Sequence, residues 1–109
     1  MDTYTYIITN IEQLTDGINT YNLSNNYPNP FNPSTAINYQ IPELSFVSLK
    51  VYDVLGSEIA TLVNEEKPSG RYEVEFSAKG GAKGLSSGVY LYRLQAGSFM
   101  EIKKMMLLR

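Results

Sequence analysis

Glu73 and Glu75 come closer in type and spacing to a catalytic pair than any other side chains of this chain. Residues two apart on a strand point to the same face, and paired carboxylates are the acid and base of glycosidases. Two acidic residues on one face of a strand are, however, more often part of a solvent-exposed surface than a catalytic pair. The chain has no histidine and no cysteine, which removes the usual acid–base group near neutral pH, thiolate nucleophiles, disulfides and zinc–thiolate sites. We therefore expect no enzyme, no metal and no cofactor.

Nine tyrosines offer a different chemistry, because an aromatic face can stack on a sugar ring. Tyr39, Tyr72 and Tyr92 fall, however, where a β-domain packs amphipathic aromatic rings across strands. A carbohydrate-binding β-sandwich module therefore stays an alternative function, which a glycan array would test.

The charge is distributed unevenly along the chain. Residues 1–78 hold ten acids and three bases, a net charge of −7, whereas residues 79–109 hold six bases and one acid, a net charge of +5. A basic end on an acidic body suggests a directional electrostatic contact. The bases are too few and too interrupted by aliphatic residues for a nucleic-acid footprint. Lys103, Lys104 and Arg109 are the candidates for this contact, although lysines on an edge strand also discourage aggregation.

A proline-rich segment, residues 27–35, lies near the start of the chain. Pro28, Pro30 and Pro33 exclude a helix or a central strand, because each lacks an N–H and restricts the residue before it. We expect polyproline II, with Phe31 docked on the domain and a polar edge of asparagines. That edge would hold Asn26, Asn29 and Asn32.

The remaining sequence predicts an all-β, immunoglobulin-like sandwich of about seven antiparallel strands, because short β-branched and aromatic runs alternate with turns. The expected strands are 35–41, 46–54, 58–63, 71–77, 88–95 and 99–108. Between them we expect a polar turn at 64–70 and a mobile loop at 78–87. Residues 3–9 have the composition of a strand that could add to a sheet edge or to another copy, and Asp16-Gly17 is typical of a turn.

The register of the last hairpin can be predicted from its charges. A two-residue loop would set Glu101 and Lys103 on the face of Tyr92 and Leu94, and so bury charge. A three-residue loop, 96–98, instead pairs Leu94 with Met100 and Arg93 with Glu101. We therefore predict the three-residue loop.

Six blocks of the sequence resemble the C-terminal sorting domains of the type IX secretion system, the Por secretion family. The blocks are LSNNYPNPFNP at 23–33, LKVYDVLG at 49–56, EIATLV at 58–63, SG at 69–70, GVYLYRLQAG at 88–97 and KKMMLLR at 103–109. They follow the order and spacing of that family, although residues 78–87 are longer than its usual link. The family motif falls on Asn29, Pro30, Phe31, Asn32, Pro33, Gly56, Gly70, Gly88 and Tyr90.

The resemblance implies a non-enzymatic module that directs a larger cargo across the periplasm to the cell surface or the medium. The expected partners are the type IX translocon, which would recognise Lys103, Lys104 and Arg109, and a sortase-like peptidase. That peptidase removes the signal as the cargo is attached to lipopolysaccharide or released. An immunoglobulin-like assembly domain of the flagellar hook-capping type is the other alternative.

The resemblance divides the chain into two parts. Residues 23–109 would be the sorting domain, and residues 1–22 an upstream segment, a linker or an extra strand. We expect neither a transmembrane helix nor a signal peptide, since the chain has no apolar run near 18 residues and no basic-then-apolar start. An export address would then lie on an upstream part of the cargo.

Overall fold

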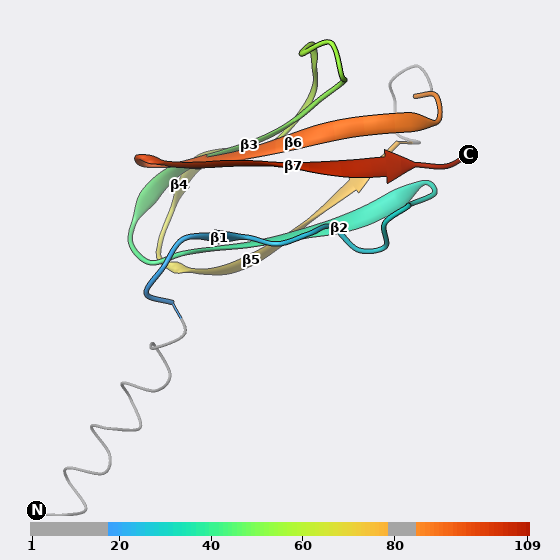
Figure 1. Ribbon diagram of the computed structural model, residues 1–109. Coiled ribbons are helices and arrows are strands. Elements are labelled where there is room, and N and C mark those ends of the chain that lie inside the picture. The colour runs from blue at the N-terminus through green and yellow to red at the C-terminus, as the bar shows by residue number, and fades with distance from the viewer. Residues whose placement is uncertain (1–17, 79–84) are drawn as a thin grey trace, which may run out of the picture.

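The computed structural model describes residues 18–78 and 85–109, which form two antiparallel sheets packed face to face (Figure 1). One sheet has the order β1-β2-β5 and the other the order β4-β3-β6-β7. The strands are β1 (Asn22–Leu23), β2 (Ser34–Ile41), β3 (Ser45–Tyr52), β4 (Glu58–Lys67), β5 (Gly70–Ser77), β6 (Gly88–Ala96) and β7 (Phe99–Leu107). The predicted immunoglobulin-like β-sandwich is confirmed. The strand expected at 3–9 and the turn at 16–17 lie outside the described residues.

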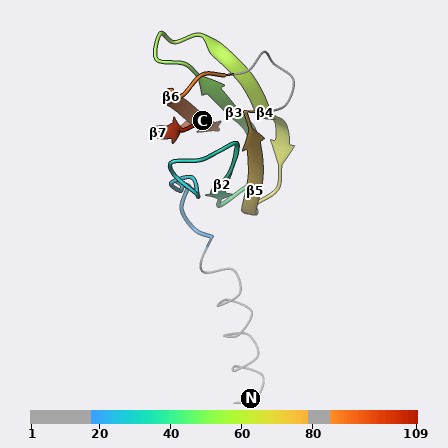
Figure 2. The same ribbon diagram turned by 90° about the vertical axis from the view of Figure 1, so that its right-hand side faces the viewer.

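Alternating apolar residues build the core between the sheets, as the strand periodicity predicts. Ile37 and Ile41 of β2 are fully buried, and so are Val47, Leu49 and Val51 of β3. Their intervening neighbours point to the outer faces. In Figure 2, the four-stranded sheet can be followed from β4 on the right to β6 and β7 on the left. β7 is therefore an edge strand.

The polar turn expected at 64–70 is wrong for most of its length. β4 continues to Lys67, and its last four residues pair with the start of β3, from Ser48↔Asn64 to Ser45↔Lys67. Only Pro68 and Ser69 remain as the connection to β5. β4 lies at the other edge of the four-stranded sheet, where side chains can reach water. Glu65 and Glu66 are exposed there, so these polar residues do not end the strand.

The last hairpin turns over two residues and not three. Ala96 pairs with Phe99, and Gly97 between them has φ of +60°. A Gly-Ser pair with a positive φ at the glycine fits a type II′ turn. The predicted pairs Leu94–Met100 and Arg93–Glu101 are therefore wrong, and the observed register pairs Leu94 with Glu101 and Arg93 with Ile102.

The inner face of β7 tolerates charge because this strand lies at the rim of the sandwich. Glu101 and Lys103 keep 40% and 25% of their side-chain surfaces exposed and form an ion pair of 3.4 Å. The three-residue loop was expected on the assumption that this face is closed to water along its whole length. At a sheet edge the ion pair stays hydrated, so the desolvation cost that seemed to exclude this register is small.

Two tyrosine hydroxyls lie buried, and they differ in their surroundings: Tyr92 makes a hydrogen bond, whereas the Tyr39 hydroxyl has no hydrogen-bond partner among the described residues. The Tyr92 hydroxyl donates a 2.7 Å hydrogen bond to the Ser24 carbonyl, which ties β6 to the other sheet beside β1. Burial raises the pKa of Tyr92 to about 12. Burial also raises the pKa of Tyr39 to about 12, and nearby Tyr72 and Glu65 add to this effect.

These pKa values predict a loss of stability at alkaline pH. A pKa of about 12 in the folded state exceeds the ordinary value of 10.0, so the contribution of the neutral hydroxyl is complete below pH 10 and is lost as the pH rises toward 12. Tyr92→Phe keeps the ring and cannot titrate. Urea unfolding between neutral pH and about pH 12 should therefore show a shallower alkaline decline for this variant. An identical decline in both proteins would contradict the assignment.

Leu94 and Gln95 provide a neighbouring pair with opposite environments, since Leu94 is fully buried and Gln95 is exposed. Leu94→Ala should lower the free energy of unfolding by about 2–5 kcal/mol through lost burial and a cavity. Gln95→Ala should change it by less than about 0.5 kcal/mol. Urea titrations of both variants measure the difference, and equal losses would mean that β6 does not face the core as described.

Candidate recognition surface at the C-terminal strand

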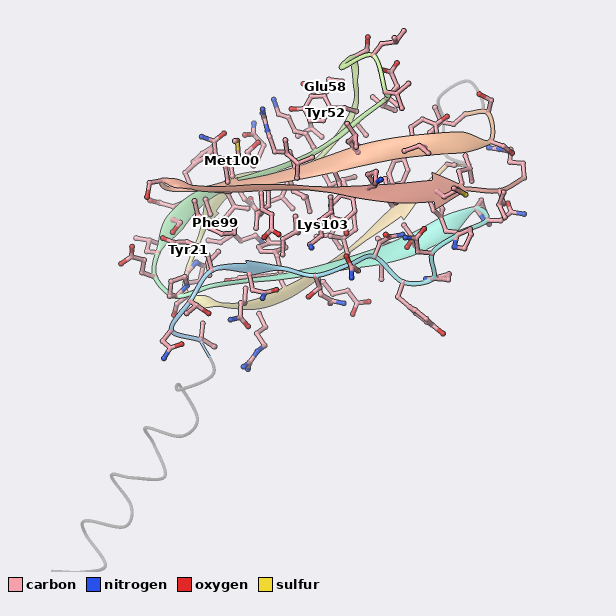
Figure 3. The ribbon with its side chains drawn as sticks, in the orientation of Figure 1. Tyr21, Tyr52, Glu58, Phe99, Met100 and Lys103 are labelled. Atoms are coloured by element: carbon pink, nitrogen blue, oxygen red, sulfur yellow. The ribbon has the colours of Figure 1, made fainter. Side chains whose placement is uncertain are left out.

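Strand β7 is anchored along one edge and at both ends. It pairs with β6 from Ala96↔Phe99 to Gly88↔Leu107. Met105 and Leu107 are buried in the core, so the C-terminal half of the strand is fixed by apolar packing. At its other end, the Phe99 ring stacks on Tyr21 at 5.1 Å between ring centres (Figure 3). The last strand is therefore an ordered part of the domain.

Phe31 of the proline-rich segment bonds to the edge of β7 that faces away from β6, at the C-terminal end of the strand. The ring is 1% exposed and meets Phe76 of β5 edge-on at 6.0 Å. The Phe31 amide donates to the Met106 carbonyl at 2.9 Å, and the Phe31 carbonyl accepts from the Leu108 amide at 3.0 Å. This short parallel bridge pairs the segment with the last residues of β7. The predicted docking of Phe31 is confirmed.

The conformation of that segment differs from the expected polyproline II helix. All three X–Pro bonds are cis, and the asparagines do not share an edge. Asn26 is buried and donates to the Thr35 hydroxyl and the Pro28 carbonyl. Asn29 accepts from the Met106 amide at 3.0 Å, and Asn32 is exposed. Side-chain bonds to particular backbone groups decide this shape, and proline spacing alone does not predict them.

The three basic residues singled out in the sequence do not form one cluster. Lys103 lies on the inner side of β7, as Figure 3 shows, and its ammonium group pairs with the Glu101 carboxylate at 3.4 Å. Lys104 is exposed on the outer face, opposite Leu91 of β6. Arg109 follows the strand, where its guanidinium donates to the Ala78 carbonyl at 3.1 Å and its amide to the Ser87 hydroxyl at 2.9 Å. Of these three residues, only Lys104 has a side chain without an ion pair or hydrogen bond among the described residues.

An exposed apolar row on the outer face of β7 was not predicted from the sequence. It comprises Met100, Ile102 and Met106, with exposures of 55%, 53% and 40%, and Leu108 continues it beyond the strand. Figure 3 shows Met100 on the side of β7 away from Lys103. Correct pairing of the hairpin would have revealed the row, since residues two apart share a face. We call Met100, Ile102, Lys104 and Met106 the outer row.

The remaining residues of the family motif lie in turns or near the ends of strands. Gly56 has φ of +91° in the β3–β4 turn, where a side chain would be strained. In the same turn the Asp53 carboxylate accepts from the Leu55 and Ser57 amides. Gly70 and Gly88 begin β5 and β6. Tyr90 is buried, and its hydroxyl donates to the Ser86 carbonyl at 2.7 Å.

The candidate enzymatic and sugar-binding residues have ordinary structural surroundings. Glu73 and Glu75 are exposed on one face of β5. Residues 18–78 and 85–109 contain no group of three acidic, histidine or cysteine side chains that could hold a metal. Tyr39 stacks on Tyr72 at 5.2 Å, and Tyr39 and Tyr92 are buried. Because these tyrosine rings pack against one another or in the core, they do not form an exposed platform for a sugar ring.

In a comparison with known protein families, the chain matches the secretion system C-terminal sorting domain over residues 25–108. The chain belongs to this family. The sorting domain thus carries the C-terminal signal for type IX secretion, and the resemblance noted in the sequence is confirmed. A search among curated proteins finds no match. In the described part of the sorting domain, no helix has the length and apolarity needed to span a membrane.

The Phe31 anchor yields a stability prediction. Phe31→Ala removes a fully buried ring next to Phe76 and should lower the free energy of unfolding by about 3–5 kcal/mol. Asn32→Ala is the matched control, because its side chain is exposed next to Phe31, and should change stability by less than about 0.5 kcal/mol. Thermal and urea unfolding measure both. An unchanged midpoint for Phe31→Ala would show that the segment is a linker and not an anchor.

Proposed function

We propose that this sorting domain carries a larger cargo through the periplasm and the type IX translocon to the cell surface or the medium. One observation supports this above the others: β7 is held as an ordered edge strand while its outer row faces water. A signal in this form can be recognised as a folded shape. The cargo itself would be an upstream domain.

The processing chemistry would belong to the export machinery. A sortase-like peptidase would remove the signal as the cargo is attached to lipopolysaccharide or released. The described residues of β7 supply apolar and charged surface for recognition. The role of the domain would therefore be to present the strand.

Within β7, Lys104 is better placed than Lys103 for recognition by a partner. Lys104 stands in the outer row between Ile102 and Met106, whereas Lys103 faces the other sheet and pairs with Glu101. A partner with an acidic group and apolar side chains would complement the outer row. Arg109 would contribute mainly by holding the end of the strand in place, since both of its contacts join it to neighbouring loops.

A reporter fused in front of residues 1–109 tests this proposal in a host that has a type IX system. The reporter should reach the cell surface or the medium, measured by surface protease accessibility and by fractionation. Deleting residues 103–109 should leave it in the periplasm. Because that deletion also removes the buried Met105 and Leu107, point variants are needed to separate recognition from folding.

Lys104→Gln and Lys103→Gln form the matched pair of point variants. Both should keep nearly the wild-type melting temperature, since exposed ion pairs contribute about 1 kcal/mol or less. Lys104→Gln should reduce export more strongly than Lys103→Gln. Surface display that survives the full deletion would overturn the proposed function, and equal effects of the two point variants would overturn the role of Lys104 alone.

A further inference from the structure

The free edge of β7 has no backbone partner from Met100 to Lys104 among the described residues. In an antiparallel pair, alternate residues direct both N–H and C=O toward the neighbouring strand. Met106 directs its amide and carbonyl to Asn29 and Phe31, away from β6. The pairing with β6 is continuous, so Met100, Ile102 and Lys104 point their backbone groups in the same direction as Met106. No described residue bonds these groups.

The side chains of this open stretch are self-complementary. A second β7 can pair with it antiparallel only if outward-pointing residues meet outward-pointing residues. When the two-fold axis passes through Ile102, Met100 of each copy meets Lys104 of the other, and Glu101 meets Lys103. Registers centred on Glu101 or on Lys103 instead set identical charges opposite each other, which is unfavourable. A register centred on Lys104 would collide with Phe31, which already covers Met106.

We infer that the free edge of β7 binds β7 of a second copy of this chain, antiparallel and centred on Ile102. The two four-stranded sheets then join into one continuous sheet across an isologous contact. On one face, Glu101 of each copy lies opposite Lys103 of the other. On the opposite face, Ile102 meets Ile102, which covers part of a side chain that is 53% exposed in the single chain.

A contact made by one short strand edge buries little surface, so the association is expected to be weak and reversible. Sedimentation velocity of the full chain over a concentration series is the appropriate measurement. The weight-average mass should rise from one chain toward two as the concentration increases. A mass of one chain throughout the series would overturn the inference.

Charge reversal tests the register. Glu101→Lys places lysine opposite lysine in the homodimer, and Lys103→Glu places glutamate opposite glutamate, so each variant alone should be a monomer. An equimolar mixture of the two variants should associate again, because every lysine then meets a glutamate. The double variant, Glu101→Lys with Lys103→Glu, should also associate. A mixture that stays monomeric, or single variants that dimerise like the wild type, would overturn the proposed register.

Ile102→Pro provides the backbone control. It removes an N–H that points away from β6, and proline is tolerated on an edge strand when the lost N–H faces outward. This variant should keep its far-ultraviolet spectrum and thermal unfolding but should not dimerise. If Ile102→Pro is folded and still dimerises, the contact does not use the edge of β7. If it unfolds, the mixing experiment with the charge variants decides between the two outcomes.

Discussion

The Phe31 ring lies in the core between the two sheets, and the position of the last strand depends on it. Its side chain contacts Phe76 of the three-stranded sheet, while its backbone bonds Met106 and Leu108 at the edge of the four-stranded sheet. Burial of such a ring is worth roughly 1.5–3 kcal/mol. One residue thus joins both layers, and it lets a proline-rich segment substitute for a strand at the end of β7.

Most of the strands and the core were predictable from the sequence, but β1, the last part of β4 and the pairing of the last hairpin were not. Ile37, Leu49 and Leu94 are buried where alternation places them. The hairpin prediction failed because it treated Glu101 and Lys103 as fully buried, and burial at the rim depends on which strand lies at the edge of the sheet. That order is set by contacts between distant segments, which the alternation within one strand does not report.

The candidate site was predictable as a segment but not as a surface. The basic end of the chain drew attention to β7, yet two adjacent lysines on a strand must point to opposite faces. Lys103 therefore pairs with Glu101, and Lys104 stands among apolar residues. Arg109 bonds Ala78 across the fold, a contact that depends on how the ends of β5 and β7 meet. The outer row follows from the observed register and from the edge position together.

The bridge between Phe31 and Leu107 joins two positions that are 76 residues apart, from 107 minus 31. Contacts over such separations slow folding, because bringing distant parts of the chain together costs loop-closure entropy. The end of β7 is therefore covered only when the first and last parts of the domain have come together beside Phe76. An export apparatus that accepts β7 only in this covered form would therefore accept only a fully folded sorting domain, and no separate chaperone would be needed to reject a partly folded one.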